Sequence, residues 1–275
     1  MKVSCLPVSL FQEIVSGKME IRDWAREAKK AGLDSIDIST LFVKAHTPVY
    51  LREFRDAITS EGISITMVTA YPDLCHPDAI ERERQLEYLY TDIAVSSYLD
   101  AKYLRVLAGQ AHPETPVDKG IKWAVDGLKK ATNKAELFGV NLVYENHAKP
   151  GSWDYIDFSH PTDIFLKIVE DTKDIPLGIN FDTANIIAYG DDTISVLKKV
   201  IDRVVTIHAA DTCTKGTLTP VLLGEGLVPF EEIFKVLKSS GFDGWICIEE
   251  ASNRGMEGIV KATEFVRRVW KDTLV

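Results

Sequence analysis

Hydrophobic residues along this chain gather in short runs that alternate with amphipathic segments. Eight runs of about four to six residues are rich in valine, isoleucine and leucine. Such continuous hydrophobicity is typical of strands that are buried on both faces of a parallel sheet. We expect these strands at residues 3–8, 34–38, 63–68, 102–107, 140–144, 176–181, 203–207 and 245–248.

The segments between the runs repeat hydrophobic residues every three or four positions, which is the period of a helix with one buried face. Ile21, Trp24, Ala25 and Ala28 keep this period in one such segment. We expect helices at residues 20–31, 78–98, 117–137, 229–239 and 257–270. Because strands and helices alternate, we predict a parallel sheet covered by helices.

Eight strand-and-helix units in 275 residues average about 34 residues each, the size of one unit of a (β/α)8 barrel. We therefore predict an α/β fold of this kind, a TIM barrel that forms one domain over residues 1–275. A doubly wound open sheet is the structural alternative. The turn at residues 7–17 carries no Gly-x-Gly-x-x-Gly sequence, however, and the chain has no Walker-type glycine-rich loop.

Composition and charge narrow the range of partners. The formal net charge is −9, whereas nucleic-acid binding usually requires a basic domain, so we expect no nucleic-acid partner. No run approaches the roughly 20 apolar residues of a membrane span, and Ser4, Pro7 and Ser9 interrupt the first run before it resembles a secretion signal. The four cysteines are scattered without a Cys-x-x-Cys pair. We therefore expect free thiols, no membrane partner and a cytoplasmic location.

Four consecutive strands in the second half of the chain end in a side chain that can bind a metal: Glu145, Asp182, His208 and Glu249. The carboxyl ends of barrel strands form the face that carries the chemistry in TIM-barrel enzymes. Each residue alone has a simpler explanation. A glutamate can meet water at a strand end, Asp182 can cap a helix, and a lone histidine is most often a hydrogen-bonded core residue. All four at equivalent strand ends predict a metal site.

Three carboxylates and one imidazole form an oxygen-rich set of ligands. Such a set suits one divalent ion with open positions for substrate oxygens, and we predict Mn²⁺, with Mg²⁺ and Co²⁺ as alternatives. Zn²⁺ is a further alternative, although it more typically recruits additional histidine or cysteine ligands.

Four motifs extend this pattern: Phe-Asp-Thr-Ala-Asn at 181–185, His-Ala-Ala-Asp at 208–211, Leu-Gly-Glu-Gly at 223–226 and Gly-Phe-Asp-Gly at 241–244. In this order and spacing the chain resembles the xylose isomerase-like TIM barrels, the sugar phosphate isomerase/epimerase superfamily, whose fold is related to endonuclease IV. The resemblance covers essentially the full chain. Its motifs are specific for the superfamily but do not identify the substrate.

The resemblance implies that Glu145, Asp182, His208 and Glu249 bind the metal. In the ketose 3-epimerases of this superfamily the two glutamates also act as acid and base on opposite faces of the substrate, which implies those roles for Glu145 and Glu249. The expected function is a metal-dependent sugar isomerase or epimerase that removes a proton next to a carbonyl and forms a metal-stabilised enediolate. We expect a small sugar or keto-sugar as substrate, and a homodimer or homotetramer as the assembly.

Two positions depart from the epimerase pattern. Many members have a histidine three residues after the strand-six aspartate, where this chain has Asn185. The substrate-binding arginine of the epimerases, about six residues after His208, is replaced by Thr214 and Lys215. Both differences put a simple free-ketose epimerase in doubt.

His147, two residues after Glu145, supports an alternative function. Glu-Asn-His at this position resembles superfamily members that act as dehydratases, or as lyases on 3-keto-sugars and glycosides. The alternative is therefore a metal-dependent lyase or dehydratase that eliminates from a 3-keto-sugar, a keto-glycoside or an inosose, with His147 as acid or base. His147 as an ordinary loop histidine bonded to backbone is the simpler explanation.

Five further residues are candidates for binding the substrate. Trp153 belongs to an aromatic loop that suits a lid over a sugar ring, a dimer contact or a packed surface loop. His112 lies in a predicted loop, Asn185 comes three residues after Asp182, and Lys215 stands near the position of the missing arginine. Arg105 is expected to point into the barrel, where Asp37 or Glu145 would neutralise it.

Two other classes of protein share this barrel. An endonuclease IV-like enzyme with three zinc ions needs many more histidines than the six of this chain, only two of which are well placed. A non-catalytic sugar-binding barrel does not require a complete set of metal ligands. Both are therefore weaker explanations than a metal enzyme.

Overall fold

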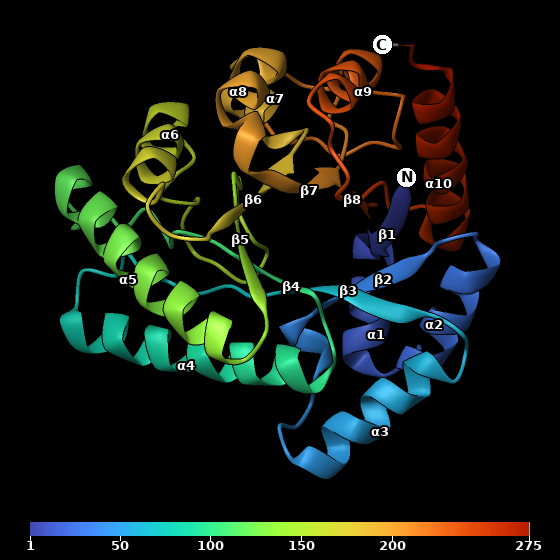
Figure 1. The fold of residues 1–275 in the computed structure, drawn as a ribbon, viewed down its shortest axis with the longest axis horizontal. Helices are drawn as coiled ribbons and strands as arrows, with labels where there is room; N and C mark the ends of the chain where they lie inside the picture. The colour runs from blue at the N-terminus through green and yellow to red at the C-terminus, as the bar shows by residue number, and fades with distance from the viewer. Residues whose placement is uncertain (275) are drawn as a thin grey trace.

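The computed structural model describes residues 1–274 and is built on one sheet of eight parallel strands (Figure 1). The strands follow the order β1-β8-β7-β6-β5-β4-β3-β2, so each lies beside its neighbours in sequence and β1 lies beside β8. Their bounds are β1 Lys2–Leu6, β2 Ser35–Ser39, β3 Ser64–Thr69, β4 Tyr103–Val106, β5 Asn141–Glu145, β6 Gly178–Asp182, β7 Val204–Ala209 and β8 Trp245–Glu249. The predicted TIM barrel is confirmed, and each predicted strand is present.

The barrel is nearly closed between β1 and β2. The backbone N–H of Asp34 donates to the carbonyl of Val3 at 2.9 Å, and the N–H of Val3 donates to the Asp34 carboxylate at 2.8 Å. Further along, the Ser4 hydroxyl donates to the buried Asp37 carboxylate at 2.8 Å. Side chains therefore bridge the junction at which the first two strands meet.

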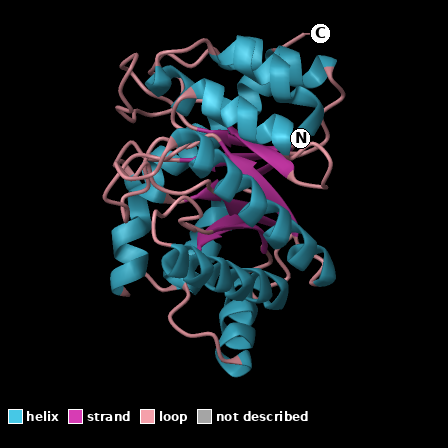
Figure 2. Ribbon diagram, turned by 90° about the vertical axis from the view of Figure 1, so that its left-hand side faces the viewer, coloured by secondary structure: helices cyan, strands magenta, loops and turns pink. Residues whose placement is uncertain are grey.

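Helices surround the strands on the outside (Figure 2). Their bounds are α1 Phe11–Ser16, α2 Ile21–Lys30, α3 Pro48–Thr59, α4 Ala79–Tyr98, α5 Val117–Leu137, α6 Thr162–Asp171, α7 Asn185–Tyr189, α8 Thr193–Val200, α9 Phe230–Ser239 and α10 Gly255–Asp272, with short 3-10 helices η1 Val8–Leu10, η2 Thr40–Phe42 and η3 Ile201–Arg203. The five helices expected from periodicity are α2, α4, α5, α9 and α10. Within residues 1–274, no helix is both long enough and apolar enough to cross a membrane.

The inside of the barrel changes from apolar to charged along the strands. Met67, Tyr103, Val143 and Cys247 come from β3, β4, β5 and β8 and form a small buried cluster separate from the main core. Because these strands are not all neighbours, the four side chains meet across the barrel interior. Alternate residues of a strand share a face, so the next inward positions on β4, β5 and β8 are Arg105, Glu145 and Glu249. This register places charged groups at the carboxyl ends of the strands.

Candidate metal centre

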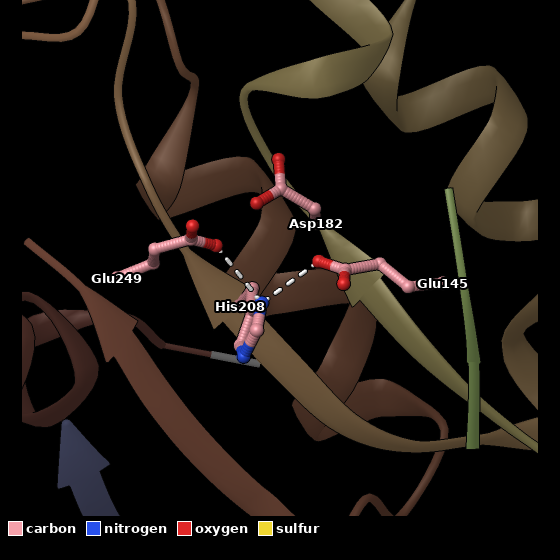
Figure 3. A group of neighbouring side chains, drawn as sticks. All are labelled: Glu145, Asp182, His208 and Glu249. Atoms are coloured by element: carbon pink, nitrogen blue, oxygen red, sulfur yellow. Dashed lines mark hydrogen bonds and ion pairs between the residues drawn. The ribbon is translucent and has the colours of Figure 1, made fainter. Parts of the chain in front are cut away.

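The four predicted metal ligands converge at the carboxyl ends of β5 to β8 (Figure 3). One ligand atom from each of Glu145, Asp182, His208 and Glu249 lies within 4.8 Å of the others. Asp182 and His208 are direct neighbours in the register of β6 and β7, which fixes two of the four side by side. The strand ends therefore bring together residues separated by more than 100 positions in sequence.

His208 lies between the two glutamates. Its Nδ1 is 2.7 Å from Oε1 of Glu145 and 3.0 Å from Oε2 of Glu249, while Nε2 points away from the carboxylates and has no hydrogen-bond partner among residues 1–274 (Figure 3). Burial opposes a charged ring, but the negative charges of Glu145 and Glu249 prevail and raise the pKa of His208 well above its usual value. The imidazolium thus provides a positive charge between two carboxylates.

Asp182 holds the backbone that leads into α7 and is one of the four possible metal ligands. Its Oδ1 accepts hydrogen bonds from the backbone N–H groups of Ala184 and Asn185, at 2.8 and 2.7 Å, at the start of α7. Burial, together with the negative charges of Glu249 and Glu145, raises the pKa of Asp182 well above its usual value. Asp182 thus orders the turn before α7, whose N-cap residue is Ala184, and also offers a carboxylate oxygen to the group of four.

Asn146, which sequence reasoning did not single out, fixes the position of Asp182. Its Oδ1 accepts from the backbone N–H of Asp182 at 3.0 Å, and its Nδ2 donates to the carbonyl of Asp182 at 2.9 Å. Asn185 in turn donates from Nδ2 to the carbonyl of Asn146 at 3.1 Å. The only sequence signal was the place of Asn146 between Glu145 and His147.

Arg105 on β4 neutralises Glu145. Its Nε lies 2.9 Å from Oε2 of Glu145, Nη1 donates to the carbonyl of Ala70 at 3.2 Å, and the guanidinium stacks 4.8 Å from the centre of the Tyr71 ring. Burial opposes the ionised carboxylate, but His208 and then Arg105 lower the pKa of Glu145. Of the two acidic partners expected for Arg105, Glu145 is the one observed, and Asp37 pairs with Ser4 instead.

A divalent cation fits these four side chains. Oxygen and nitrogen ligands lie about 2.0–2.6 Å from Zn²⁺ or Ca²⁺, so donor atoms within 4.8 Å of one another can all reach one ion. Three carboxylates, those of Glu145 and Asp182 buried and that of Glu249 partly exposed, face only one imidazole and one guanidinium. Burial and then the two neighbouring carboxylates raise the pKa of Asp182, as expected where negative charge is in excess. A dication would remove that excess.

A cavity of about 570 Å³ opens onto the centre. Asp182 and Glu249 line it, whereas Glu145 and His208 are not among its lining residues. The side chain of Glu249 is 19% exposed and that of Glu145 is 0% exposed. Of the two glutamates predicted to be catalytic, Glu249 alone faces the cavity.

His147 also lines the cavity. The Tyr189 hydroxyl donates to its backbone carbonyl at 2.7 Å and fixes its position, while its Nδ1 has no hydrogen-bond partner in the described part of the chain. Burial lowers the pKa of His147 to about 4, so the ring is neutral at pH 7. The predicted acid or base is therefore placed beside the metal centre.

The five predicted substrate-binding residues divide into two groups. Arg105 and Asn185 line the cavity. Trp153 is buried outside the lining, Lys215 is exposed on the loop after β7, and His112 pairs with Asp73 at 2.7 Å between Nε2 and Oδ2. The structure does not bring these last three to the cavity.

Two acidic residues that follow strand ends hold the neighbouring loops. Asp211, after β7, accepts hydrogen bonds from four backbone N–H groups, those of Thr212, Gly224, Gly226 and Val228, at 2.8–3.1 Å. A Cβ atom at Gly226 would lie 2.2 Å from Oδ1 of Asp211, so glycine is required for this close approach. The Gly-Glu-Gly backbone at 224–226 therefore passes close to the Asp211 carboxylate.

Glu250, directly after Glu249, was missed because a second glutamate at a strand end carries no distinct sequence signal. It is fully buried and accepts hydrogen bonds from the hydroxyls of Ser9 and Ser252. Its carbonyl also accepts from the Ser9 N–H at 2.8 Å. Glu250 thus ties the loop after β8 to the loop after β1.

Comparison with known proteins places the chain among related barrels. The family model described as xylose isomerase-like TIM barrel matches residues 25–269. An inosose dehydratase of Clostridium beijerinckii is 25% identical over 188 residues, which cover 58% of this chain and 60% of that protein. The chain thus spans less than two thirds of the length of this curated relative.

Solved structures show the same fold at low identity. A D-tagatose 3-epimerase-like protein superposes with a TM-score of 0.79 at 21% identity, covering 98% of this chain and 97% of that chain. The IolI protein with a bound zinc atom gives a TM-score of 0.79 at 20% identity, covering 100% and 99%.

Proposed function

This chain belongs to the xylose isomerase-like TIM barrel family, and we propose that it is a metal-dependent enzyme that removes a proton next to the carbonyl of a small keto-sugar. The observation that carries the proposal is the convergence of three carboxylates and one imidazole beside a cavity of about 570 Å³. A divalent ion held by Glu145, Asp182, His208 and Glu249 would polarise the carbonyl and stabilise the negative charge that develops on its oxygen.

Glu249 is the base in this proposal. Its carboxylate lines the cavity, whereas that of Glu145 lies behind it in contact with Arg105 and His208. A general base must reach the proton that it removes. Glu145 then serves as a ligand whose position Arg105 fixes.

His147 makes elimination the favoured outcome. Its neutral imidazole borders the same cavity as Glu249, and the N–H of a neutral imidazole donates one hydrogen bond. Glu249 takes the proton from the carbon next to the carbonyl and becomes a carboxylic acid, a C=C bond forms, and the C–O bond to the leaving group breaks. The departing oxygen accepts a hydrogen bond from His147 and takes up the proton that Glu249 holds. Water or an alcohol leaves. The inosose dehydratase relatives support this assignment.

Isomerisation or epimerisation is the second candidate. Glu145 and Glu249 both contact Nδ1 of His208, at 2.7 and 3.0 Å, and so lie on either side of one imidazole. Two carboxylates that flank a metal centre suit proton removal on one face of a carbon and return on the other. The position of Glu145 outside the cavity lining counts against this candidate.

The test is incubation of the Mn²⁺-loaded protein in D₂O with panels of ketoses, inososes and 3-keto-glycosides, followed by mass spectrometry. Deuterium gain with otherwise unchanged mass indicates isomerisation or epimerisation, and loss of water or aglycone indicates elimination. We expect His147→Ala to abolish elimination but retain deuterium exchange, and Glu249→Gln to abolish both. A protein that binds no divalent ion and exchanges no proton would contradict the proposal.

Three finer points stay predictions: Mn²⁺ as the ion, a cytoplasmic location, and a homodimer or homotetramer. The zinc atom in the IolI structure makes Zn²⁺ the first alternative to test, by metal analysis of the purified protein.

A further inference from the structure

The cavity has two chemically different sides. The side formed by β4, β5 and β6 carries polar groups, among them Arg105, His147 and Asp182. The segments after β1 and β2 form a mainly apolar wall of Val8, Phe11, Val15 and Leu41, with Gln12 as its one polar side chain, and Leu218 and Val221 from the loop after β7 extend it. Since β1 and β2 lie across the barrel from β5 and β6, Val8, Phe11, Val15 and Leu41 face the polar side over the cavity.

The apolar wall is held in place by specific contacts. Phe11 packs on Phe42 with ring centres 4.8 Å apart. The Ser39 hydroxyl caps η2 by accepting from the N–H of Leu41 at 3.1 Å. Glu250 ties down Ser9 in η1, as described above. A ligand that packs on the wall therefore meets a pre-formed surface, which reduces the cost of ordering on binding.

Several side chains of the wall remain in contact with solvent. Val15, Leu41 and Leu218 are large hydrophobic residues that stay exposed, and Leu41 is 48% exposed. Apolar residues clustered in this way beside a cavity are typical of a ligand-binding surface. Hydroxyl groups placed against them would lose hydrogen bonds to water without gaining partners. A free sugar, with hydroxyls on nearly every carbon, does not match this side.

We propose that the substrate carries an apolar substituent, an aryl aglycone, that packs on the wall while its keto-sugar ring lies at the metal centre. The inference rests on the proposed function and names the class of substrate, an aryl keto-glycoside. A cavity of 570 Å³ lies within the range of about 300–1,000 Å³ found for drug-sized ligands, and so holds more than one six-carbon ring. In elimination, the aryl alcohol would be the leaving group beside His147.

The test compares two unreactive glycosides of one sugar, phenyl β-glucoside and methyl β-glucoside, by isothermal titration into the Mn²⁺-loaded protein. We expect phenyl β-glucoside to bind about tenfold or more tightly, since burial of a ring of that size is worth at least one decade of affinity. Leu41→Ser should reduce that preference by about three- to tenfold and leave methyl β-glucoside unchanged. Leu227→Ser is the matched control, because Leu227 is 52% exposed and does not line the cavity.

Equal affinity for the two glycosides, or no binding of either, would overturn the inference. The inference would also be overturned if Leu41→Ser and Val15→Ser both kept the full preference for phenyl β-glucoside over methyl β-glucoside. If instead light scattering shows a dimer that Leu41→Ser dissociates, and no phenyl preference is found, the wall binds a second copy of the chain and the inference is wrong.

Failure of the proposed function can be distinguished from failure of the inference about the apolar wall. It would appear as absence of Mn²⁺ uptake and of deuterium exchange, neither of which depends on the wall. A phenyl preference without metal binding would support the apolar wall as a binding surface and contradict the proposed enzymatic function. Deuterium exchange without a phenyl preference would support the enzymatic function and contradict the aryl keto-glycoside as substrate.

Discussion

Arg105 and Glu145 form an ion pair inside the barrel with side chains only 1% and 0% exposed, joined from Nε to Oε2 at 2.9 Å. Two charges removed from water are stabilising only when each satisfies the other, and loss of one partner leaves an uncompensated buried charge. This pair also holds the one glutamate of the centre that does not face the cavity.

Arg105→Met should therefore lower the free energy of unfolding by about 3–5 kcal/mol, measured by urea denaturation. Arg105→Lys is the control: it retains the charge but loses the planar stacking on Tyr71, and should cost less. A loss in Arg105→Met below about 1 kcal/mol would mean that Glu145 does not depend on this partner.

Divalent metal should stabilise the protein through Asp182. Mn²⁺ at about 100 times its dissociation constant should raise the free energy of unfolding by about 2.7 kcal/mol, and EDTA should reverse this. Asp182→Asn should remove most of the increment. Without metal the same variant should be at least as stable as wild type, because the amide oxygen can still accept from the N–H groups of Ala184 and Asn185 and the substitution removes one of three crowded carboxylates. Thermal unfolding with and without Mn²⁺ measures both effects.

Asn146 should control metal affinity without being a ligand. Asn146→Ala removes both hydrogen bonds to the Asp182 backbone and leaves a buried N–H and a buried carbonyl unpaired. Loss of groups that orient ligands typically costs about 10–100-fold in metal affinity. Titration with Mn²⁺ should show a loss of this size, while circular dichroism reports whether the barrel is intact. Unchanged affinity in a folded variant would rule out the positioning role.

Stability should depend on pH through Asp157. Burial raises the pKa of this carboxyl from its ordinary value of 3.8 to about 8, against the opposing hydrogen bonds from Ser159. Between these two values the folded protein holds a proton that the unfolded chain releases. The contribution of Asp157 to stability is therefore present below about pH 4 and is lost as the pH rises toward 8, by up to about 1.4 kcal/mol per pH unit.

Asp157→Asn removes this titration and resembles the protonated acid in shape. Relative to wild type, the variant should gain stability between pH 5 and pH 8, as measured by urea unfolding at each pH. Asp243→Asn, at an exposed position, should show no such gain. Parallel pH curves for wild type and Asp157→Asn would show that the carboxyl is already ionised when folded.

The positions of the metal ligands at the strand ends were predictable from sequence. A buried hydrophobic run that stops at Glu145 or Glu249 shows where the strand ends, and the alternation of side chains along the strand shows on which face the glutamate lies. For the same reason, the sequence predicted that the acidic partner of Arg105 is either Asp37 or Glu145. Loop residues were different. His112 lies beside Asp73, 39 positions away, and Trp153 is buried in its own loop, and neither contact leaves a periodic signal.

Asn146 and Glu250 were overlooked for a related physical reason. Each is a polar residue next to a ligand, and its role depends on a hydrogen bond to a distant segment. Asn146 bonds to Asp182 and Glu250 to Ser9, contacts that exist only once the barrel has formed.

The contact between Ser9 and Glu250 joins residues 241 positions apart, and β1 takes its ladder partner from β8. During synthesis a nascent chain that has emerged through β7 holds Glu145, Asp182 and His208, but β1 still lacks β8 and the centre lacks Glu249. β8 therefore completes the pairing of β1 and supplies the fourth ligand in one step. Until β8 is made, the centre cannot offer all four side chains to a metal.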